Sequence, residues 1–208
     1  MVKIAIAGLK GGTGKTTLAM NIASYMAYDD TKVGLRDLDG QRSLTDLFTV
    51  YDSMGGFVES GMLELEKPDG EYKVLIADMP PYIKDNAALQ LSEFDFLVIP
   101  SKYSPLELLS VRKFMNTVEA ARKLNPNLKF AVVFNQVKPT AMVEEIKTAV
   151  KDLKIPFFVT KIMDRVDYSR SLEFGGIFNN VEGNNGFANE KAKKEISDLV
   201  REIENILY

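Results

Sequence analysis

A glycine- and lysine-rich stretch near the start of the chain, residues 8–17 (GLKGGTGKTT), constrains the fold more than any other feature of the sequence. It follows an apolar run at residues 2–7 that is typical of a buried parallel strand. It precedes an amphipathic segment at residues 16–28 that is typical of a helix. A glycine-rich turn between a strand and a helix can hold phosphate groups, because its backbone N–H groups point inward and the helix N-terminus adds unpaired amides. The sequence therefore predicts a phosphate-binding loop at the start of an α/β fold.

Two lysines distinguish this loop. Lys15 stands where it would reach the β- and γ-phosphates of a nucleotide, and the hydroxyl of Thr16 would coordinate Mg²⁺. The standard form of the loop has a glycine where this chain has Leu9, and this chain has instead a second lysine, Lys10. A glycine turn without a ligand is the alternative, but it leaves the register of the lysines and threonines unexplained. The residues expected to bind the nucleotide here are Gly11, Gly12, Thr13, Gly14, Lys15, Thr16 and Thr17.

The amino-acid composition excludes several classes of site. The 208 residues contain no cysteine and no histidine, which removes disulfides, thiolate and histidine metal sites, and cysteine or histidine catalysis. The net charge of −3 gives no overall basic field for nucleic acid, so any such site must be a local patch. The first apolar run is too short for a signal peptide, and no segment approaches the roughly 20 apolar residues of a membrane span. We therefore expect a cytoplasmic protein with one domain, residues 1–208.

Predicted strands and helices alternate along the whole chain. This pattern favours an α/β fold with a mainly parallel sheet and helices on both faces. A tight turn at residues 68–70 separates two strands, and Ser104 and Pro105 mark the start of the longest helix as its N-cap and first residue. The expected strands are residues 2–7, 32–36, 63–66, 72–78, 94–99, 128–134 and 155–159. The expected helices are residues 16–28, 43–48, 83–91, 105–124, 143–153, 166–174 and 189–207.

Polar side chains follow three of the predicted strands. Asp37 and Asp39 come directly after the second strand. Asp78 ends the fourth strand, and Asn135 follows the sixth. Ligands of open α/β sheets bind beyond the carboxyl ends of the strands, so we expect these side chains at one site. An apolar strand that ends in an aspartate beside a phosphate loop is the Walker B arrangement, in which Asp78 would hold the Mg²⁺ shell through water.

These motifs together resemble those of the ParA/MinD superfamily of ATPases. The segment KGGTGKTT (residues 10–17) resembles the deviant Walker A loop of that superfamily, and DLDGQ (37–41) is similar to its D-x-D-P-Q segment. DMPP (78–81) resembles its D-x-P-P segment, and RVDY (165–168) with GG (175–176) resembles an element near its C-terminal end. The resemblance covers nearly the whole chain and is strongest to the small ParA-type, ParF-like partition proteins. It implies a single-domain P-loop NTPase fold.

The resemblance also implies roles for individual residues. Lys10 would cross a dimer interface and neutralise phosphate charge on the partner's nucleotide. Asp39 would orient the attacking water, and Asp37 would support Mg²⁺. The catalytic residues implied are Lys10, Lys15 and Asp39, and the metal-binding residues are Thr16, Asp37 and Asp78. The base contacts implied are Asn135, Met163 and Asp164.

Two positions depart from the pattern of that family. Gly40 replaces the usual proline of the D-x-D-P-Q segment, and Arg36 precedes Asp37 where the family usually has an apolar residue. A charge at the end of a buried strand needs a partner. Asp37 or another acid can supply it, so a structural ion pair is the alternative role for Asp37.

The function implied by the resemblance is weak hydrolysis of ATP with Mg²⁺, coupled to an ATP-dependent sandwich dimer. The leading hypothesis is partition of plasmid or chromosomal DNA, in which the ATP dimer binds DNA without sequence preference, associates with the nucleoid and has a small ParB-like centromere-binding partner. One alternative is a scaffold that positions protein cargo. The other is a biosynthetic ATP-dependent ligase of the same superfamily, although the sequence shows no obvious substrate-binding constellation.

Several basic residues are candidates for contact with DNA. Lys147, Lys151 and Lys154 form a stripe beside the apolar side of their predicted helix, although an ordinary solvated face would look the same. The further candidates are Arg112, Lys113, Arg122, Lys123, Lys138, Lys161, Arg165 and Arg170.

The last predicted helix, residues 189–207, raises the question of membrane attachment. MinD-like relatives attach to membranes by a C-terminal basic amphipathic helix. The polar side of this helix mixes basic with acidic residues, whereas anionic lipid would favour a basic face. We therefore expect the helix to pack on the sheet, and we expect no membrane binding.

Overall fold

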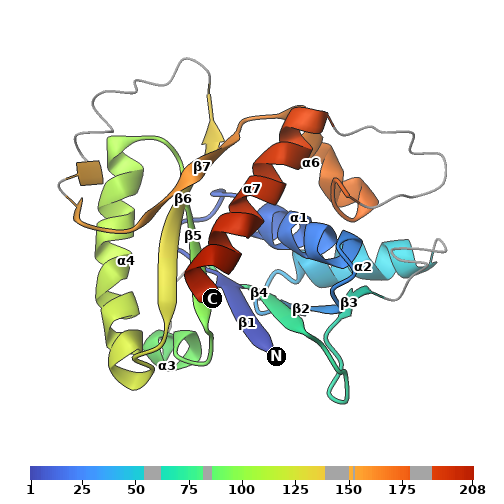
Figure 1. The fold of residues 1–208 in the computed structure, drawn as a ribbon, viewed down its shortest axis with the longest axis horizontal. Coiled ribbons are helices and arrows are strands. Elements are labelled where there is room, and N and C mark those ends of the chain that lie inside the picture. Colours follow the sequence, from blue (N-terminus) through green and yellow to red (C-terminus); the bar gives the residue numbers. More distant parts are fainter. Residues whose placement is uncertain (54–61, 82–85, 139–149, 152, 179–188) are drawn as a thin grey trace.

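A seven-stranded sheet runs through the middle of the molecule (Figure 1). The computed structural model describes residues 1–53, 62–81, 86–138, 150–151, 153–178 and 189–208. The strand order is β3-β2-β4-β1-β5-β6-β7, and the strand pairs are parallel. The strands are β1 (Val2–Ile6), β2 (Val33–Asp37), β3 (Leu63–Leu65), β4 (Val74–Asp78), β5 (Phe96–Ser101), β6 (Lys129–Val137) and β7 (Phe157–Met163).

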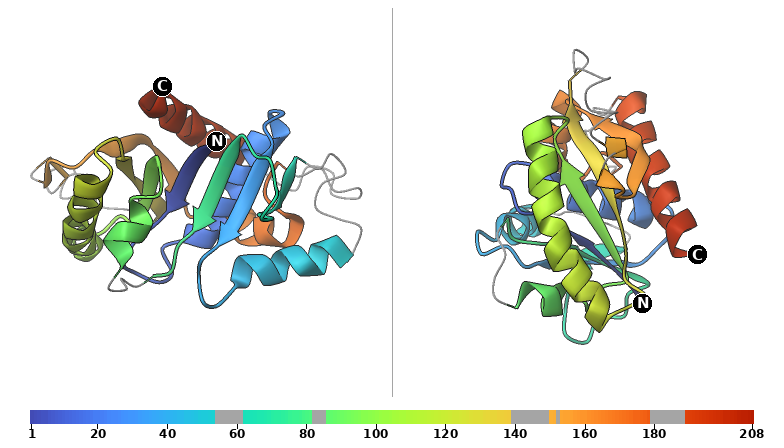
Figure 2. Two further views of the ribbon diagram at one scale, coloured as in Figure 1. Left: turned by 90° about the horizontal axis from the view of Figure 1, so that it is seen from below. Right: turned by 90° about the vertical axis from the view of Figure 1, so that its left-hand side faces the viewer.

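Helices cover both faces of this sheet. The helices α1, α2, α6 and α7 pack over one face, while α3 and α4 pack over the other. Figure 2 shows α4 and α7 on opposite sides of the sheet. The expected α/β architecture is therefore confirmed. The helices are α1 (Lys15–Tyr28), α2 (Ser43–Ser53), α3 (Ala87–Leu91), α4 (Pro105–Leu124), α6 (Val166–Ser171) and α7 (Glu190–Leu207), with a 3₁₀ turn, η1 (Leu172–Phe174), after α6.

Successive residues of the central strands point to opposite layers of the core. In β1, Ile4 and Ile6 lie in the layer under α1 and α7, and Ala5 lies in the layer under α4. All three side chains are fully buried. Strands covered on both faces need apolar residues at every position, which is why they stand out in the sequence as continuous apolar runs.

The third and fourth strands do not lie side by side. They pair with opposite edges of β2, so the chain crosses over β2 between them. The crossing begins with a turn in which the N–H of Gly70 donates to the carbonyl oxygen of Lys67 (3.0 Å). It brings the ring of Tyr72 against Gly34, where an added Cβ would lie 3.0 Å from the ring. The position of β3 at the edge of the sheet therefore depends on packing between distant segments and not on the turn alone.

Several element boundaries differ from those expected. The strand β6 continues three residues past 134 to Val137, and β7 runs to Met163 instead of ending at 159. The helix α2 continues past 48 to Ser53. Most of the helix expected at 143–153 lies outside the described residues, as do residues 83–85 of the helix expected at 83–91.

The start of α4 follows the sequence signals. The side chain of Ser104 accepts a hydrogen bond from the N–H of Glu107 (3.3 Å), and Pro105 is the first helical residue. Pro105 lacks an N–H at a position where no helical partner exists, so it fits this site without cost. The predicted N-terminus of this helix is confirmed.

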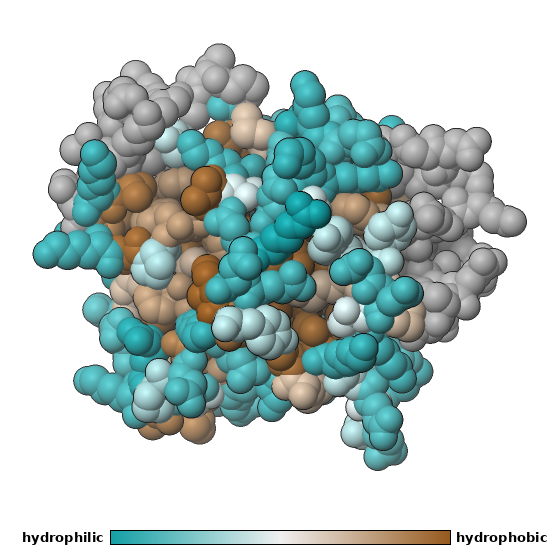
Figure 3. Space-filling model, in the orientation of Figure 1, coloured by the Kyte–Doolittle hydropathy of each residue, from teal (hydrophilic) through white to brown (hydrophobic). Residues whose placement is uncertain are grey.

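The helix α7 packs its apolar side into the core. Ile196, Leu199 and Ile203 are fully buried with α1 and β7 side chains around them. The outward side of α7 forms a hydrophilic band across the face seen in Figure 3. The expected packing of this helix is confirmed. Within the described residues, we find no helix with the length and apolar character needed to cross a membrane.

Candidate nucleotide-binding site

The glycine-rich loop lies between β1 and α1 at the carboxyl edge of the sheet. Gly12 and Gly14 have left-handed backbone angles, with φ of 70° and 84°, which suit glycine. A Cβ on Gly14 would lie 2.4 Å from Nδ2 of Asn135, so no larger residue fits there. Gly14 is also the N-cap of α1, and the first turn of this helix contains no acidic residue. The N-terminal amides and the positive end of the helix dipole are therefore available to an anion.

The side chain of Lys15 curls back over the loop. It is only 6% exposed, and its Nζ donates a hydrogen bond to the carbonyl oxygen of Lys10 (3.1 Å). Burial lowers the pKa of Lys15, and the nearby carboxylates of Asp78 and Asp39 partly oppose this effect. A buried ammonium group with one carbonyl partner is well placed to accept phosphate oxygens, which form stronger charge-assisted hydrogen bonds.

Asp78 and Thr16 meet at the carboxyl end of β4. The hydroxyl of Thr16 donates to Oδ2 of Asp78 (2.5 Å), while Oδ1 is buried and has no hydrogen-bond partner among the described residues. Burial, reinforced by the nearby charge of Asp37, raises the pKa of Asp78 to about 7. An unsatisfied carboxylate oxygen beside a hydroxyl matches the oxygen ligands that Mg²⁺ prefers. These residues therefore fit a magnesium ion.

The raised pKa of Asp78 predicts how the stability of the nucleotide-free and metal-free protein depends on pH. This carboxyl binds its proton more tightly in the folded chain, since its pKa rises from 3.8 to about 7. Its contribution to stability is therefore complete below pH 3.8 and is lost as the pH rises through about 7. Relative to Asp78→Asn, the wild type should lose about 2–3 kcal/mol of unfolding free energy between pH 5 and pH 8.

Chemical denaturation at these two pH values would measure this difference. Asp164→Asn, at an exposed position, is the matched control and should behave as the wild type does. Equal pH dependence in Asp78→Asn and the wild type would show that the Asp78 carboxyl is not perturbed.

The aspartates after β2 hold their own segment in place. Asp37 accepts hydrogen bonds from the N–H and the hydroxyl of Thr45 (2.9 and 3.0 Å) and from the N–H of Asp39 (3.1 Å). Asp39 accepts one from the N–H of Gln41 (3.0 Å). Asp37 also lies opposite Asp78 in the register of β2 and β4. The structure thus gathers all three aspartates at one edge of the sheet, and it ties Asp37 to the start of α2.

Arg36 pairs with Glu66 instead of Asp37. Its Nε and Nη2 donate to the two carboxylate oxygens of Glu66 (2.5 and 2.6 Å). The hydrogen bonds of this pair raise the pKa of Arg36 and lower the pKa of Glu66. The alternative role of Asp37 as the partner of Arg36 is therefore wrong, and the partner comes from the segment after β3.

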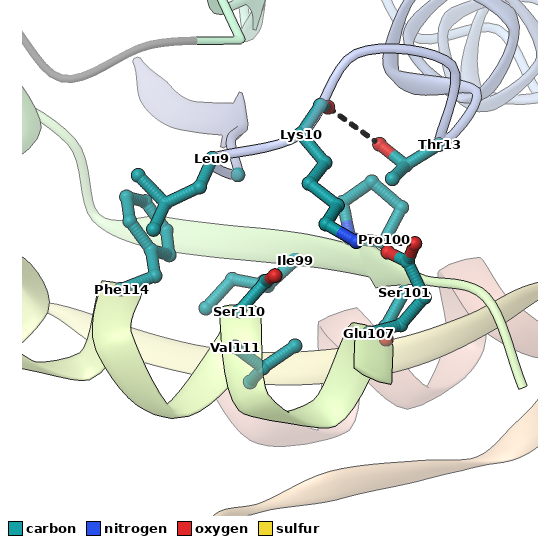
Figure 4. Close-up of a pocket in the computed structure, with 11 residues that line it drawn as sticks. Leu9, Lys10, Thr13, Ile99, Pro100, Ser101, Glu107, Ser110, Val111 and Phe114 are labelled. Atoms are coloured by element: carbon teal, nitrogen blue, oxygen red, sulfur yellow. Dashed lines mark hydrogen bonds and ion pairs between the residues drawn. The ribbon is translucent and has the colours of Figure 1, made fainter. Parts of the chain in front are cut away.

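Lys10 extends from the loop to the start of α4 (Figure 4). Its Nζ lies 2.9 Å from Oε1 of Glu107, and the two side chains are 36% and 16% exposed. The pocket that they share with Leu9 and Phe114 has a volume of about 10 Å³, which is room for about one water. Glu107 is a residue that the sequence motifs do not single out. The signal for it is its position three residues after the N-cap Ser104, where a glutamate is common.

The three base contacts implied by the resemblance lie at the ends of β6 and β7. Asn135 is 4% exposed, and its Nδ2 donates to the carbonyl oxygen of Thr13 in the loop (2.7 Å). Met163 is the last residue of β7. The N–H of Asp164 donates to the carbonyl oxygen of Val137 (2.9 Å). Asn135 therefore touches the loop itself, whereas Met163 and Asp164 lie beside the end of β6.

The C-terminal motif is organised around Glu195, another residue that sequence reasoning missed. Arg165 donates from Nε and Nη2 to Oε1 of Glu195 (3.0 and 2.5 Å), and the hydroxyl of Tyr168 donates to Oε2 (2.8 Å). The N–H of Met163 also donates to Oε2 (3.1 Å). The Arg165 side chain is only 23% exposed. Glu195 therefore engages two of the three guanidinium nitrogens of Arg165.

A buried polar network joins α1 to the segment after α6. Asn21 is fully buried, and its Nδ2 donates to the carbonyl oxygen of Thr17 (2.7 Å) and to Oγ of Ser171 (2.8 Å). Its Oδ1 accepts a hydrogen bond from the N–H of Ile177 (2.9 Å). No short motif in the sequence reveals this network. It fixes the helix that carries the phosphate loop against residues 171–178.

The basic residues considered for DNA contact are widely distributed. The helices α4 and α6 pack over opposite faces of the sheet. The candidates on these two helices therefore cannot form one patch on a single chain. Most of the candidates are described and exposed to solvent: Arg112, Lys113, Arg122, Lys123, Lys138, Lys151, Lys154, Lys161 and Arg170. Lys147 lies outside the described residues.

Comparisons with known proteins show what this chain is similar to. The model of a family described as the CobQ/CobB/MinD/ParA nucleotide binding domain matches residues 4–178. The "Maintenance of carboxysome distribution protein A" of Halothiobacillus neapolitanus is 31% identical, over 96% of this chain and 95% of that protein. The "Protein ParA" of Rhizobium radiobacter is 23% identical, over 89% of each. An ATP complex of a variant of McdA from Cyanothece has the same fold, with a TM-score of 0.75 and 18% identity over 99% of this chain and 96% of that one.

Proposed function

The chain belongs to the CobQ/CobB/MinD/ParA nucleotide-binding family, and from this premise we propose that it is a Mg²⁺-dependent ATPase that forms a dimer around ATP. We propose further that the ATP dimer binds DNA without sequence preference and partitions plasmid or chromosomal DNA with a small ParB-like partner. The observation that carries the ATPase proposal is the convergence of Lys15, Thr16 and Asp78 on the glycine loop, where Asp78 keeps an unsatisfied oxygen.

Hydrolysis requires groups that hold the phosphates and neutralise their charge. The N–H groups of the loop and of the first turn of α1 would bind the phosphates, and Lys15 would exchange the Lys10 carbonyl for phosphate oxygens. Thr16 and Asp78 would hold Mg²⁺, Asp78 through water. When bound, Mg²⁺ supplies positive charge at the β- and γ-phosphates. Asp39 would orient the attacking water, and we propose that turnover is weak.

Asp37 would connect the nucleotide site to α2. Its carboxylate binds the N–H and hydroxyl of Thr45 and stands opposite Asp78 in the sheet. A change of charge at the metal site would therefore act on the start of α2 through Asp37. In this way nucleotide hydrolysis could alter the surface that a partner protein contacts.

Lys10 would have its catalytic role in the dimer. In the single chain it pairs with Glu107. A triphosphate carries more negative charge than one carboxylate, so in the ATP dimer Lys10 would leave Glu107 and bind the phosphates of the partner's nucleotide. Dimerisation and hydrolysis would then depend on the same side chain.

Positioning of a protein cargo is the second candidate function. The similarity to a carboxysome distribution protein covers more of this chain, at higher identity, than the similarity to ParA. A biosynthetic ligase would need room for an organic acid beside the loop. Among the described residues, the two pockets that include Gly8 have volumes of about 10 and 20 Å³, so each of these holds about one water. We do not propose a ligase.

Binding to arbitrary duplex DNA tests the partition proposal. We expect binding at fixed salt with Mg-ATP, and none with ADP or without nucleotide, because only a dimer combines the cations of two chains. Glutamate substitutions at the exposed Lys151 and Lys154 should flatten the salt dependence of binding, whereas Lys191→Glu on α7 should not. An ATP dimer that binds no DNA in any nucleotide state would reject partition and favour a protein cargo.

A further inference from the structure

We infer that Gln136 recognises the adenine base of the nucleotide, as a specificity-determining residue beside Asn135. This inference rests on the proposed ATPase function and adds a residue that reads the base. It predicts that the carboxamide of Gln136 binds the edge of adenine that carries the 6-amino group.

The backbone at the end of β6 is irregular. The pairing of β6 with β7 shifts in register between Val132 and Phe134 and again between Phe134 and Val137. Gln136 lies within the second shift and has a left-handed backbone angle, φ 54°. This conformation is unfavourable for a residue with a side chain, and such residues often occur where function requires a particular geometry.

The irregularity changes where the Gln136 side chain points. In a regular strand, neighbours such as Asn135 and Gln136 point to opposite faces of the sheet. Here both carboxamides approach the glycine loop. A Cβ placed on Gly14 would lie 2.4 Å from Nδ2 of Asn135 and 3.5 Å from Nε2 of Gln136. The left-handed angle therefore brings two amide side chains to the start of α1.

The two amides are not equivalent. Asn135 is buried, and one N–H of its Nδ2 donates to the carbonyl oxygen of Thr13. Gln136 is half-buried, and its carboxamide forms no hydrogen bond within the described part of the chain. Asn135 therefore supports the loop, whereas Gln136 keeps a donor and an acceptor that none of the described residues uses.

The topology places Gln136 on the side of the loop where a base would lie. Asp78 ends β4 on one side of β1, and Gln136 is the next-to-last residue of β6 on the other side. If Asp78 supports the metal at the terminal phosphates, the nucleoside extends away from it, toward β6 and β7. Gln136 then lies beside the base.

A carboxamide suits adenine. Along one edge, adenine presents the N7 acceptor and the 6-amino donor, and a glutamine can satisfy both at once. Guanine presents two acceptors, N7 and O6, along the same edge, so the glutamine oxygen would be unpaired there. The chemistry of Gln136 therefore selects an adenine nucleotide.

Equilibrium binding with three ligands tests this inference. They are ATP, purine riboside 5′-triphosphate, which lacks only the 6-amino group, and inorganic triphosphate, each with Mg²⁺. The wild type should bind ATP about tenfold more tightly than the purine analogue, as expected for one lost hydrogen bond. Gln136→Met keeps the side-chain volume but removes the amide, so it should reduce this ratio to below about twofold. Affinity for inorganic triphosphate should not change.

Two further variants separate base recognition from backbone effects. Gln136→Gly removes the amide and relieves the left-handed strain, so it should lose selectivity while its melting temperature rises. Asn127→Ala removes an exposed carboxamide before the other end of β6 and should match the wild type. Selectivity that survives in both Gln136 variants, or a wild type that binds both nucleoside triphosphates equally, would overturn the inference and leave the ATPase proposal standing. A wild type that binds neither nucleoside triphosphate would overturn both.

Discussion

Replacing Lys15 with alanine is expected to raise the Kd for Mg-ATP by about 100-fold or more and to reduce hydrolysis to background. Lys15 is the buried cation of the loop, held by one carbonyl oxygen in the protein without ligand. A 100-fold loss corresponds to about 2.7 kcal/mol, which is within the range for hydrogen bonds to charged groups. Calorimetric titration with ATP and a phosphate-release assay would measure both effects.

Stability provides the control for this variant. Burial of the Lys15 ammonium is a cost to the protein without nucleotide, as its lowered pKa indicates. The melting temperature of the alanine variant should therefore lie within roughly 5 °C of that of the wild type. Lys191→Ala, at an exposed position, should change neither binding nor stability. An intact Lys15→Ala protein that binds ATP within a factor of about three of the wild type would contradict the assignment of this site.

Replacing Gly176 with alanine is expected to lower the unfolding free energy by about 2–4 kcal/mol. Gly176 has a left-handed φ of 106°, and a Cβ there would lie 2.3 Å from the Cβ of Ser24 on α1. The contact cannot relax easily, because Asn21 binds Ser171 and Ile177 on either side of this glycine. The substitution would therefore force residues 171–178 away from the helix that carries the phosphate loop.

A double mutant separates the clash from the backbone strain. Ser24→Gly provides space for the new methyl group, so it should recover part of the stability lost in Gly176→Ala. Urea denaturation of the wild type, both single variants and the double variant would give the coupling free energy between the two positions. Additive effects would mean that α1 and this segment do not touch as described. A loss below about 0.5 kcal/mol in Gly176→Ala would mean the same.

The local parts of this structure follow from the sequence. The glycine loop, the strands with continuous apolar runs and the start of α4 each depend on residues close together in the chain. Ser104 caps the helix three residues before Glu107, and Gly14 turns the loop at the residue before α1. For such features the sequence contains both interacting partners within a few positions.

The parts that sequence reasoning missed depend on contacts between distant segments. Lys10 meets Glu107 across 97 residues of chain, and Asn21 meets Ser171 across 150. The partner of Arg36 could not be chosen among the acids without knowing that β3 lies beside β2. The left-handed angle of Gln136 arises where β6 and β7 change register, and glutamine is not a residue that signals such an angle.

In the proposed function, Lys10 links ATP-dependent dimerisation to hydrolysis. Sedimentation velocity with a slowly hydrolysed ATP analogue and Mg²⁺ tests this role of Lys10. The wild type should be a dimer with the analogue and a monomer with ADP or without nucleotide. Lys10→Ala should stay monomeric in all three conditions, although it keeps the loop groups that bind ATP. Glu107→Gln, which frees Lys10 from its partner in the same chain, should dimerise with the analogue at least as readily as the wild type. A wild type that remains monomeric at saturating analogue, or a Lys10→Ala variant that dimerises as the wild type does, would contradict the proposal.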